Sequence, residues 1–411
     1  MSEMTATRKG VILGGGLLAV AGWVVAASYF WRTSVPHLRL GGLDEHRFFG
    51  PHELARTRSY STGVDVLWVL GTVAKLVALG VLVRRAPRLA RGLGLGPIGS
   101  AIVIGMLLLV TLWFVALPFG LAGLWWQHHW GLGPFDPGAW LLLQDVSLPA
   151  SAVFALLVIA IVVGLAVRIG RWWWLGAAPA FIAIAVAFGF VSGWVGAAGA
   201  HPVRDASLRA RVARLERTEN VHVPVRVLPV HQSTHEANAF TAGFGPSTRV
   251  VVWDTLLDGR FSARQVNVVV AHELGHAKSR HILKGLGWYA LFAFPVGLLI
   301  AVVTRRRGGL ARAANLPLAA LVFTVVGLAL TPFENAVSRR YETEADWRAL
   351  NATKDPIAAR QLFQNFAATS LQDPDPSFLD YAWLEDHPTL MQRIAMTEAF
   401  GRRCRLCRRL R

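Results

Sequence analysis

Two histidines and a glutamate form the clearest chemical motif of the sequence, which reads His272-Glu273-Leu274-Gly275-His276. Residues four apart lie on one face of an α-helix, so the two histidines can place imidazole nitrogens on one Zn²⁺ ion. The glutamate can then act as a general base toward water that the zinc activates. The motif therefore predicts one Zn²⁺ per chain and metal-assisted hydrolysis.

The residues before this motif predict the helix that it needs. Ser262 and Gln265 have the spacing of a capping box, in which each side chain bonds the other residue's backbone N–H, so a helix should begin here. The apolar run 268–271 then leads into the motif, as expected of a helix buried beneath a site. This context disfavours a chance match on an ordinary amphipathic helix.

The third metal ligand should come from farther along the chain. A catalytic zinc has three protein ligands and an open position. In metzincins a nearby histidine is the third ligand, but here His281 comes one residue too early, and we expect it to be a polar helix-end residue near the membrane boundary. Downstream, Glu342 and Asp346 share one face of a predicted helix, whereas Glu344 points about 160° away from Asp346.

We expect Glu342 to be the third ligand and Asp346 to accept a hydrogen bond from a metal-binding imidazole. Taken alone, this acidic cluster would fit a solvated helix face. Its position after two predicted spans, which return the chain to the side of the HExxH helix, favours the metal site.

Long apolar runs indicate that the protein is embedded in a membrane. The chain has 411 residues, of which 54% are hydrophobic and 16% are charged, which excludes a disordered or collagen-like protein. Seven runs approach the roughly 20 residues that cross a bilayer, at about 10–31, 63–83, 98–121, 149–168, 173–197, 283–304 and 315–333. The predicted fold class is an α-helical integral membrane protein of about seven transmembrane helices, multi-pass in the cell membrane, with an inserted α+β segment.

The apolar runs also divide the chain into segments. We expect a membrane domain of five spans at 1–199, a catalytic segment with edge strands and the HExxH helix at 200–281, a transmembrane hairpin at 282–333, a second catalytic segment at 334–400 and a basic tail at 401–411. Alternating residues predict strands at 221–229, 237–242 and 249–253, and Pro224 suggests that the first is an edge strand.

The net charge of +17 at pH 7 predicts topology rather than a nucleic-acid partner, because most of the arginines lie at span ends. The arginine-rich short loops lie on the same side as the N-terminus. By the positive-inside rule that side is cytoplasmic and the metal site faces outward, although the basic tail argues for the opposite orientation.

Four motifs occur in order along the second half of the chain. They are NAFTAGF at 238–244, RVVVWDTLL at 249–257, HELGH at 272–276 with SRRYETEAD at 338–346, and HPTLMQRI at 387–394. With the spans, these motifs resemble the type I CAAX prenyl endopeptidases and their bacterial relatives, the heat-shock-type membrane metalloproteases. The resemblance implies helices around a large chamber, with a gluzincin-like zinc protease subdomain whose ligands are His272, His276 and Glu342 and whose base is Glu273.

The resemblance also implies roles for residues that spacing alone would not single out. Asn238, Ala239 and Phe240 would lie on an edge strand that pairs with the substrate backbone. His387 and Arg393 would border the cleft, where they stabilise the oxyanion or bind the substrate. In the eukaryotic members the site faces the cytosol, contrary to the charge count.

Two classes of function remain open from the sequence. The first is an integral-membrane zinc endopeptidase, either similar to CAAX prenyl proteases or acting in membrane-protein quality control, with peptide or protein substrates that can be lipidated or membrane-bound. The alternative is a polytopic transporter or channel with regulatory polar segments, which only Phe294-Pro295 within a span favours.

Overall fold

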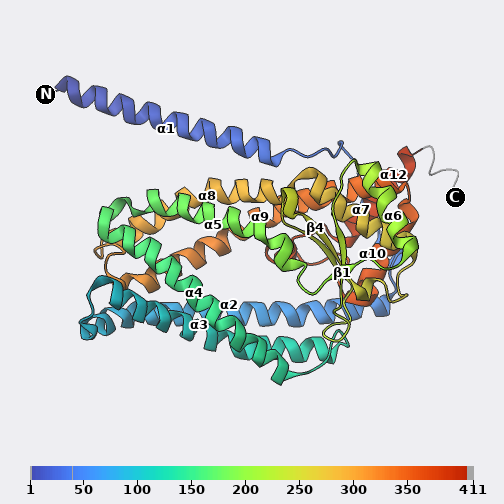
Figure 1. Ribbon diagram of the computed structural model, residues 1–411, viewed down its shortest axis with the longest axis horizontal. Coiled ribbons are helices and arrows are strands. Elements are labelled where there is room, and N and C mark those ends of the chain that lie inside the picture. The colour runs from blue at the N-terminus through green and yellow to red at the C-terminus, as the bar shows by residue number, and fades with distance from the viewer. Residues whose placement is uncertain (1, 39, 405–411) are drawn as a thin grey trace.

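The computed structural model describes residues 2–38 and 40–404, with side chains from residue 16 onward except 145 and 146. Figure 1 shows a long helical bundle with a smaller α+β region at one end, and α1 begins at the opposite end of the long axis from α12. The predicted basic tail at 401–411 is described as far as Cys404, and the rest of it lies outside the described residues.

Long helices make up most of the protein. They are α1 (Ser2–Trp31), α2 (Pro51–Leu93), α3 (Gly96–His129), α4 (Pro137–Ile169), α5 (Trp173–Gly196), α8 (His281–Arg305) and α9 (Leu316–Thr353). Among the described residues, five helical stretches are long and apolar enough to cross a membrane, namely Pro51–Leu93, Gly96–His129, Pro137–Gly196, His281–Arg305 and Ala313–Thr353. The stretch Pro137–Gly196 contains both α4 and α5, and the apolar part Gly16–Trp31 of α1 is shorter. The count of seven spans therefore stays a prediction.

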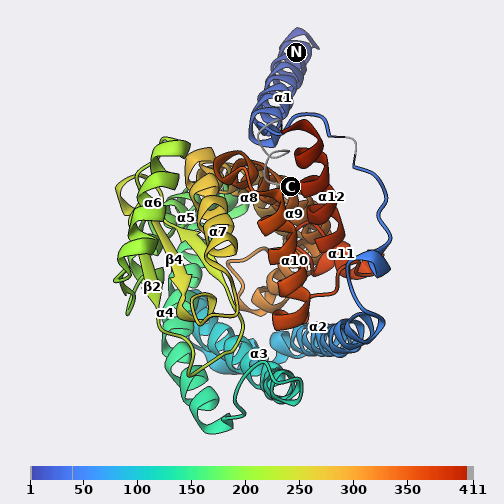
Figure 2. The same ribbon diagram turned by 90° about the vertical axis from the view of Figure 1, so that its right-hand side faces the viewer.

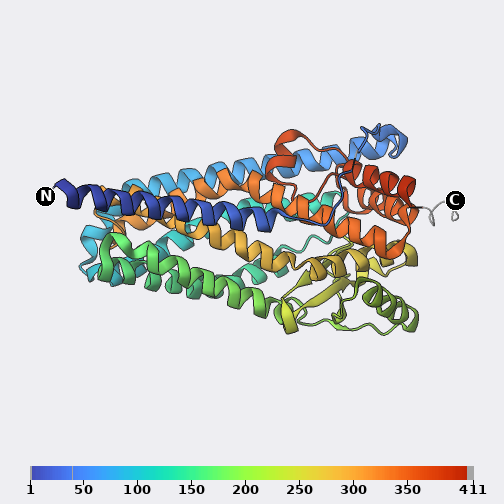
Figure 3. The same ribbon diagram turned by 90° about the horizontal axis from the view of Figure 1, so that it is seen from above.

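Large apolar side chains cover the outside of the bundle. Phe114, Leu142, Val153 and Phe188 are each more than half exposed, and they come from four different parts of α3, α4 and α5. A water-soluble monomer rarely exposes apolar surface over so wide an area. Helices satisfy their backbone hydrogen bonds internally, which is what a lipid environment requires. Figure 3 shows these helices running side by side along the long axis.

A small mixed sheet lies where the bundle ends. Its strands are β1 (His201–Pro202), β2 (Val225–Leu228), β3 (Ala239–Ala242) and β4 (Arg249–Trp253), in the order β1-β2-β4-β3. β2 pairs with β4 in parallel, β3 pairs with β4 antiparallel, and β3 lies at one edge.

The prediction that Pro224 makes its strand an edge strand is wrong. The strand begins one residue later, at Val225, and is flanked by β1 and β4. Pro224 itself contributes its carbonyl oxygen, which accepts from Val250 N at 3.1 Å. Its missing N–H therefore removes no bond from the ladder.

Helix α7 (Ala263–Ser279) carries the HExxH motif and begins where the capping box predicts. Ser262 Oγ accepts from Gln265 N at 3.4 Å, and Gln265 Oε1 accepts from Ser262 N at 2.7 Å. Figure 2 shows α7 between the sheet and a group of helices that includes α9, α10 (Pro356–Ser370) and α12 (Leu390–Arg403). Helices α6 (Ala206–Glu219) and α11 (Phe378–Trp383) complete this end of the protein. The apolar face of α7 is buried with side chains from α9, α10 and α12, including Val268, Ala271, Leu274, Leu350, Leu362 and Ile394.

A glycine lets α5 contact the turn between β3 and β4. A Cβ built on Gly193 would lie 1.9 Å from the carbonyl oxygen of Ser247 and 3.1 Å from that of Ala242. Next to it, Ser192 Oγ accepts from Gly243 N at 3.1 Å. The edge strand is thus held against α5 by a contact that any side chain larger than hydrogen would obstruct.

We predict that Gly193→Ala lowers the stability of the purified protein by about 1–3 kcal/mol, because the added methyl group overpacks against backbone. Gly164→Ala in α4 is the matched control, since a Cβ there meets nothing within 4 Å and alanine favours helix over glycine. Thermal unfolding in detergent measures both variants. Equal unfolding temperatures for the two would contradict the close contact.

Candidate metal centre

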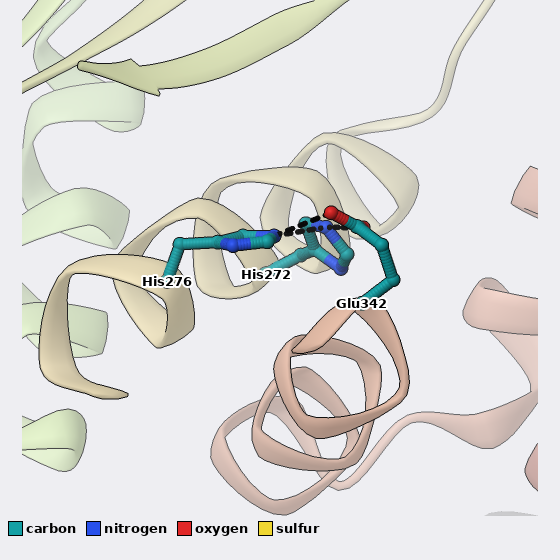
Figure 4. A group of neighbouring side chains, drawn as sticks. All are labelled: His272, His276 and Glu342. Atoms are coloured by element: carbon teal, nitrogen blue, oxygen red, sulfur yellow. Dashed lines mark hydrogen bonds and ion pairs between the residues drawn. The ribbon is translucent and has the colours of Figure 1, made fainter. Parts of the chain in front are cut away.

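Three predicted ligands converge from two helices. Figure 4 shows His272 and His276 on α7 pointing toward Glu342 on α9. His272 Nε2 lies 3.0 Å from Glu342 Oε2, and His276 Nε2 lies 3.3 Å from Glu342 Oε1. One ligand atom from each residue lies within 4.8 Å of the other two. The structure thus brings the carboxylate of Glu342 together with both motif histidines.

The chemistry of these three atoms fits a divalent cation. His272 Nε2 and His276 Nε2 face each other at 3.0 Å, and two nitrogen lone pairs at this distance repel unless a proton or a cation lies between them. Glu342 Oε2 is buried and makes no hydrogen bond of good geometry with the described residues. A buried carboxylate oxygen without a donor is costly. A metal ion would satisfy all three groups at once.

Close packing of α7 on α9 brings the ligands together. At Gly275, a Cβ would lie 3.3 Å from Cα and 3.4 Å from the carbonyl oxygen of Ala345. The two helices thus touch almost backbone to backbone, between the residues that carry the ligands. Glycine and alanine at this contact are the reason a single carboxylate can reach both imidazoles.

Behind His272, a buried ion pair holds the imidazole in place. Asp346 Oδ1 accepts from His272 Nδ1 at 2.8 Å, and Arg393 binds both carboxylate oxygens of Asp346, with Nε–Oδ2 at 2.8 Å and Nη2–Oδ1 at 2.7 Å. All three residues are buried. The resemblance implied that Arg393 borders the cleft, and the structure places its guanidinium on Asp346, with the ring of Phe363 beneath it.

The carboxylates around His272 favour positive charge at this position. Burial alone would lower the pKa of its imidazole, but the hydrogen bond to Asp346 and the nearby negative charge of Glu342 outweigh burial and raise the pKa to about 10. The same two carboxylates would attract a metal dication. A bound cation would take the place of the extra proton, because imidazole binds metal in its neutral form.

Glu273 lies beside the cluster and contacts the edge strand. Thr241 Oγ1 on β3 lies 2.8 Å from both Glu273 Oε2 and the Glu273 carbonyl oxygen, and its single proton can be donated to either. Spacing in the sequence gave no indication of this contact, because it joins a strand and a helix 32 residues apart. The hydroxyl contacts one carboxylate oxygen of Glu273 and leaves the other available.

The predicted substrate-binding residues lie at the start of β3. Ala239 and Phe240 belong to this edge strand, and Asn238 immediately precedes it. Asn238 is exposed, its carbonyl accepts from Trp253 N at 3.0 Å, and its Oδ1 accepts from Ala239 N at 2.8 Å.

His387 also contacts the carboxylate of Glu342. Its Nε2 lies 3.2 Å from Glu342 Oε2, and its Nδ1 lies 2.6 Å from Asp386 Oδ1. Partial desolvation opposes the charged imidazole, but Glu342 and Asp386 prevail and raise the pKa of His387. This histidine can therefore donate a proton or a hydrogen bond beside the metal ligands.

His281 lies at a helix end, as expected, but it is also buried against His276. It is the first residue of α8, and its Nδ1 lies 3.0 Å from His276 Nδ1. Arg280, in the left-handed region at φ 55°, separates α7 from α8 and turns the chain so that His281 returns to His276. If residues 272–281 are assumed to form one continuous helix, the contact between His276 and His281 is not predicted.

Comparisons with known proteins identify the same region. The sequence profile "Peptidase family M48" matches residues 202–400. The chain is 31% identical over 211 residues to the "Uncharacterized metalloprotease YhfN" of Bacillus subtilis (strain 168), covering 48% of this chain and 49% of that protein. It is 31% identical to a "Protease HtpX homolog" of Acidiphilium cryptum (strain JF-5), covering 51% of this chain and 76% of that protein. It is 30% identical to the "CAAX prenyl protease 1 homolog" of Arabidopsis thaliana, covering 47% of each. The match thus spans about half the length of the Bacillus and Arabidopsis relatives.

A solved structure extends the likeness to the helical bundle. The crystal structure of Ste24p from S. mikatae superposes with a TM-score of 0.69 and covers 93% of this chain and 97% of that one. At 16% identity, this likeness shows a shared fold. Because it covers 93% of the chain, it extends into the helices before residue 202, where the family profile does not match.

We predict that Asp346→Asn weakens zinc binding about 10–100-fold, because the neutral amide loses the charge-assisted bond that orients His272. Asp205→Asn is a matched control, since Asp205 caps α6 far from the site and asparagine caps equally well. Competition with a chromophoric chelator measures both affinities. Wild-type affinity in the Asp346 variant would show that this carboxylate does not act on the metal centre.

Proposed function

The chain belongs to peptidase family M48, and on this premise we propose that it is an integral-membrane zinc metalloendopeptidase. The observation that carries the proposal is the convergence of His272, His276 and Glu342, with Glu273 adjacent on the same helix. Apolar helices long enough to span a membrane support the multi-pass location.

Two imidazoles and one carboxylate are a ligand set suited to zinc with an open position. When bound, zinc would supply Lewis-acid polarisation of water and of the substrate carbonyl. His272, His276 and Glu342 would hold the ion. Asp346 and Arg393 would act through His272, whose ring they orient.

Glu273 would move the proton that peptide hydrolysis requires. Its carboxylate oxygen not held by Thr241 would accept a proton from the attacking water and pass it to the leaving amine nitrogen. Thr241 would hold one oxygen of this carboxylate. His387 would donate a hydrogen bond to the oxyanion, and its raised pKa favours the protonated form that this role needs.

The free edge of β3 would bind the substrate backbone. A peptide in extended conformation can add to an edge strand through main-chain hydrogen bonds. Ala239 and Phe240 lie on this edge, and Asn238 is exposed at its start. Because Thr241 on the same strand contacts Glu273, a peptide bound here would lie next to the base.

The proposed substrates are peptides or proteins at the membrane. The name of the Arabidopsis relative points to prenylated CAAX sequences, and damaged membrane proteins are the other candidate. We propose the same segments as expected from the sequence. Residues 1–199 and 282–333 would lie in the membrane, and residues 200–281 and 334–400 would form the catalytic part. By the positive-inside rule, this part would face away from the cytoplasm, because the arginines at 84–91, 168–171 and 305–312 lie at the other end of the bundle (Figure 1).

We predict that Glu273→Gln retains zinc but loses peptide hydrolysis by about 10²–10⁴-fold, since the amide cannot accept the proton. His272→Ala should lose both zinc and activity, and Glu398→Gln on α12 should change neither. Metal analysis and cleavage of two peptides that differ only by a prenylated cysteine are measured on the same samples. Full activity of purified Glu273→Gln protein would refute the mechanism, and the peptide preferred by the wild type identifies the substrate class.

We also predict which end of the bundle faces outward. Single cysteines replace His222, which is exposed on the catalytic part, or Arg306 at the other end, in a chain whose Cys404 and Cys407 are serine. The His222→Cys protein should react with a membrane-impermeant maleimide on intact cells, and the Arg306→Cys protein should react only after permeabilisation. The reverse pattern would place the catalytic part in the cytoplasm.

A further inference from the structure

A buried chain of side chains leads away from the second metal-binding histidine. With Nε2 of His276 facing the other two ligands, its ring proton lies on Nδ1, which is 3.0 Å from Nδ1 of His281. Nε2 of His281 lies in turn 3.2 Å from Oε2 of Glu344. The Nδ1–H of His276 therefore donates to His281, and the Nε2–H of His281 donates to Glu344.

The ring of His281 has little freedom to turn. It is 6% exposed, and it stacks on the ring of Tyr341 with centroids 4.6 Å apart and planes 6° apart. The hydroxyl of Tyr341 donates to the carbonyl of Phe30 at 2.8 Å and accepts from Trp288 Nε1 at 3.0 Å. The ring that orients His276 is thus itself held in one plane by a fixed partner.

The chain of hydrogen bonds ends on the N-terminal segment of the protein. Ser34 donates to Glu344 Oε1 twice, from its backbone N at 3.0 Å and from its Oγ at 2.6 Å. Lys284 Nζ donates to the carbonyl of Arg32 at 3.0 Å, which holds the same segment against α8. In Figure 1, the C-terminal end of α1 is the part of that helix nearest the bundle. Ser34 lies outside residues 202–400, where the family profile matches.

We propose that His281 and Glu344 are positioning residues that orient His276 for the metal, and that Ser34 holds Glu344 in the geometry this requires. The inference rests on the proposed function, because it assumes that His276 is a ligand. Its physical basis is that a ligating histidine donates its other N–H to a fixed acceptor, which sets the tautomer and the ring orientation. His272 has such an acceptor in Asp346, and His281 with Glu344 supplies the corresponding one for His276.

The alternative is that Glu344 serves folding alone. Lys284 Nζ lies 3.6 Å and Arg348 Nη2 lies 3.7 Å from its carboxylate, so the group also joins α8 to α9 as a buried ion-pair cluster. A purely structural cluster would change the unfolding temperature when it is broken and leave the metal site of the folded protein unaltered. Metal affinity and the spectrum of bound metal therefore distinguish the two roles.

The test compares full-length variants by zinc affinity, by the visible spectrum of the Co²⁺-substituted protein and by unfolding of the metal-free protein. His281→Phe keeps the stacking on Tyr341 but removes the acceptor for His276. Glu344→Gln keeps an acceptor for Ser34 but removes the charge, and remains informative if His281→Phe does not fold. Ser34→Ala removes one donor at the end of the chain. Thr33→Ala is its control, since the described part of the chain shows no bond between Thr33 and Glu344.

We expect His281→Phe to weaken zinc binding about 10–100-fold and to shift the Co²⁺ absorption bands. Glu344→Gln should change both in the same direction, Ser34→Ala should change them less, and Thr33→Ala should leave them at wild-type values. Wild-type zinc affinity and an unchanged Co²⁺ spectrum in folded His281→Phe and Glu344→Gln proteins would overturn the proposal. Such a result leaves the proposed function intact, whereas a wild-type protein that binds no zinc refutes the function itself.

Discussion

The metal centre depends on the close contact between α7 and α9 at Gly275 and Ala345. The two helices are joined through α8: the chain leaves the site along α8 and returns to it along α9. Close approach places Glu342 of α9 within 3.3 Å of both motif histidines. Hydrophobic burial of α7 against α9, α10 and α12 stabilises this arrangement. The polar site is therefore built on one face of a helix whose other face is core.

The need to pair buried charges explains which residues surround the carboxylates of the site. Glu342, Glu344 and Asp346 are buried carboxylates on one helix, and each must be paired to be tolerated. Asp346 has Arg393, and Glu344 has Ser34, His281 and more distant cations. Glu342 is surrounded by histidines, and its Oε2 makes no hydrogen bond of good geometry with the described residues. The carboxylate left for a metal ion is thus the one without a full set of protein partners.

The sequence could predict contacts that depend on helical periodicity. The His272–His276 face, the Ser262–Gln265 cap and the opposite directions of Glu342 and Glu344 each follow from spacing within a few residues. Contacts across a break between two helices, or between residues far apart in the sequence, could not be predicted. Arg280 reverses the chain before His281, Ser34 reaches Glu344 across 310 residues, and Thr241 meets Glu273 where a strand crosses a helix. The prediction of an edge strand from Pro224 failed because the strand begins at the residue after this proline.

X-ray absorption at the zinc edge of the purified full-length chain tests the central claim most directly. The account predicts one zinc per chain with nitrogen and oxygen neighbours only, and with outer-shell scattering from two imidazole rings. Loss of one ring from the signal in a His276→Ala protein would assign that ligand. A wild-type spectrum with sulfur ligands, with a single imidazole or without bound zinc would contradict a centre formed by His272, His276 and Glu342.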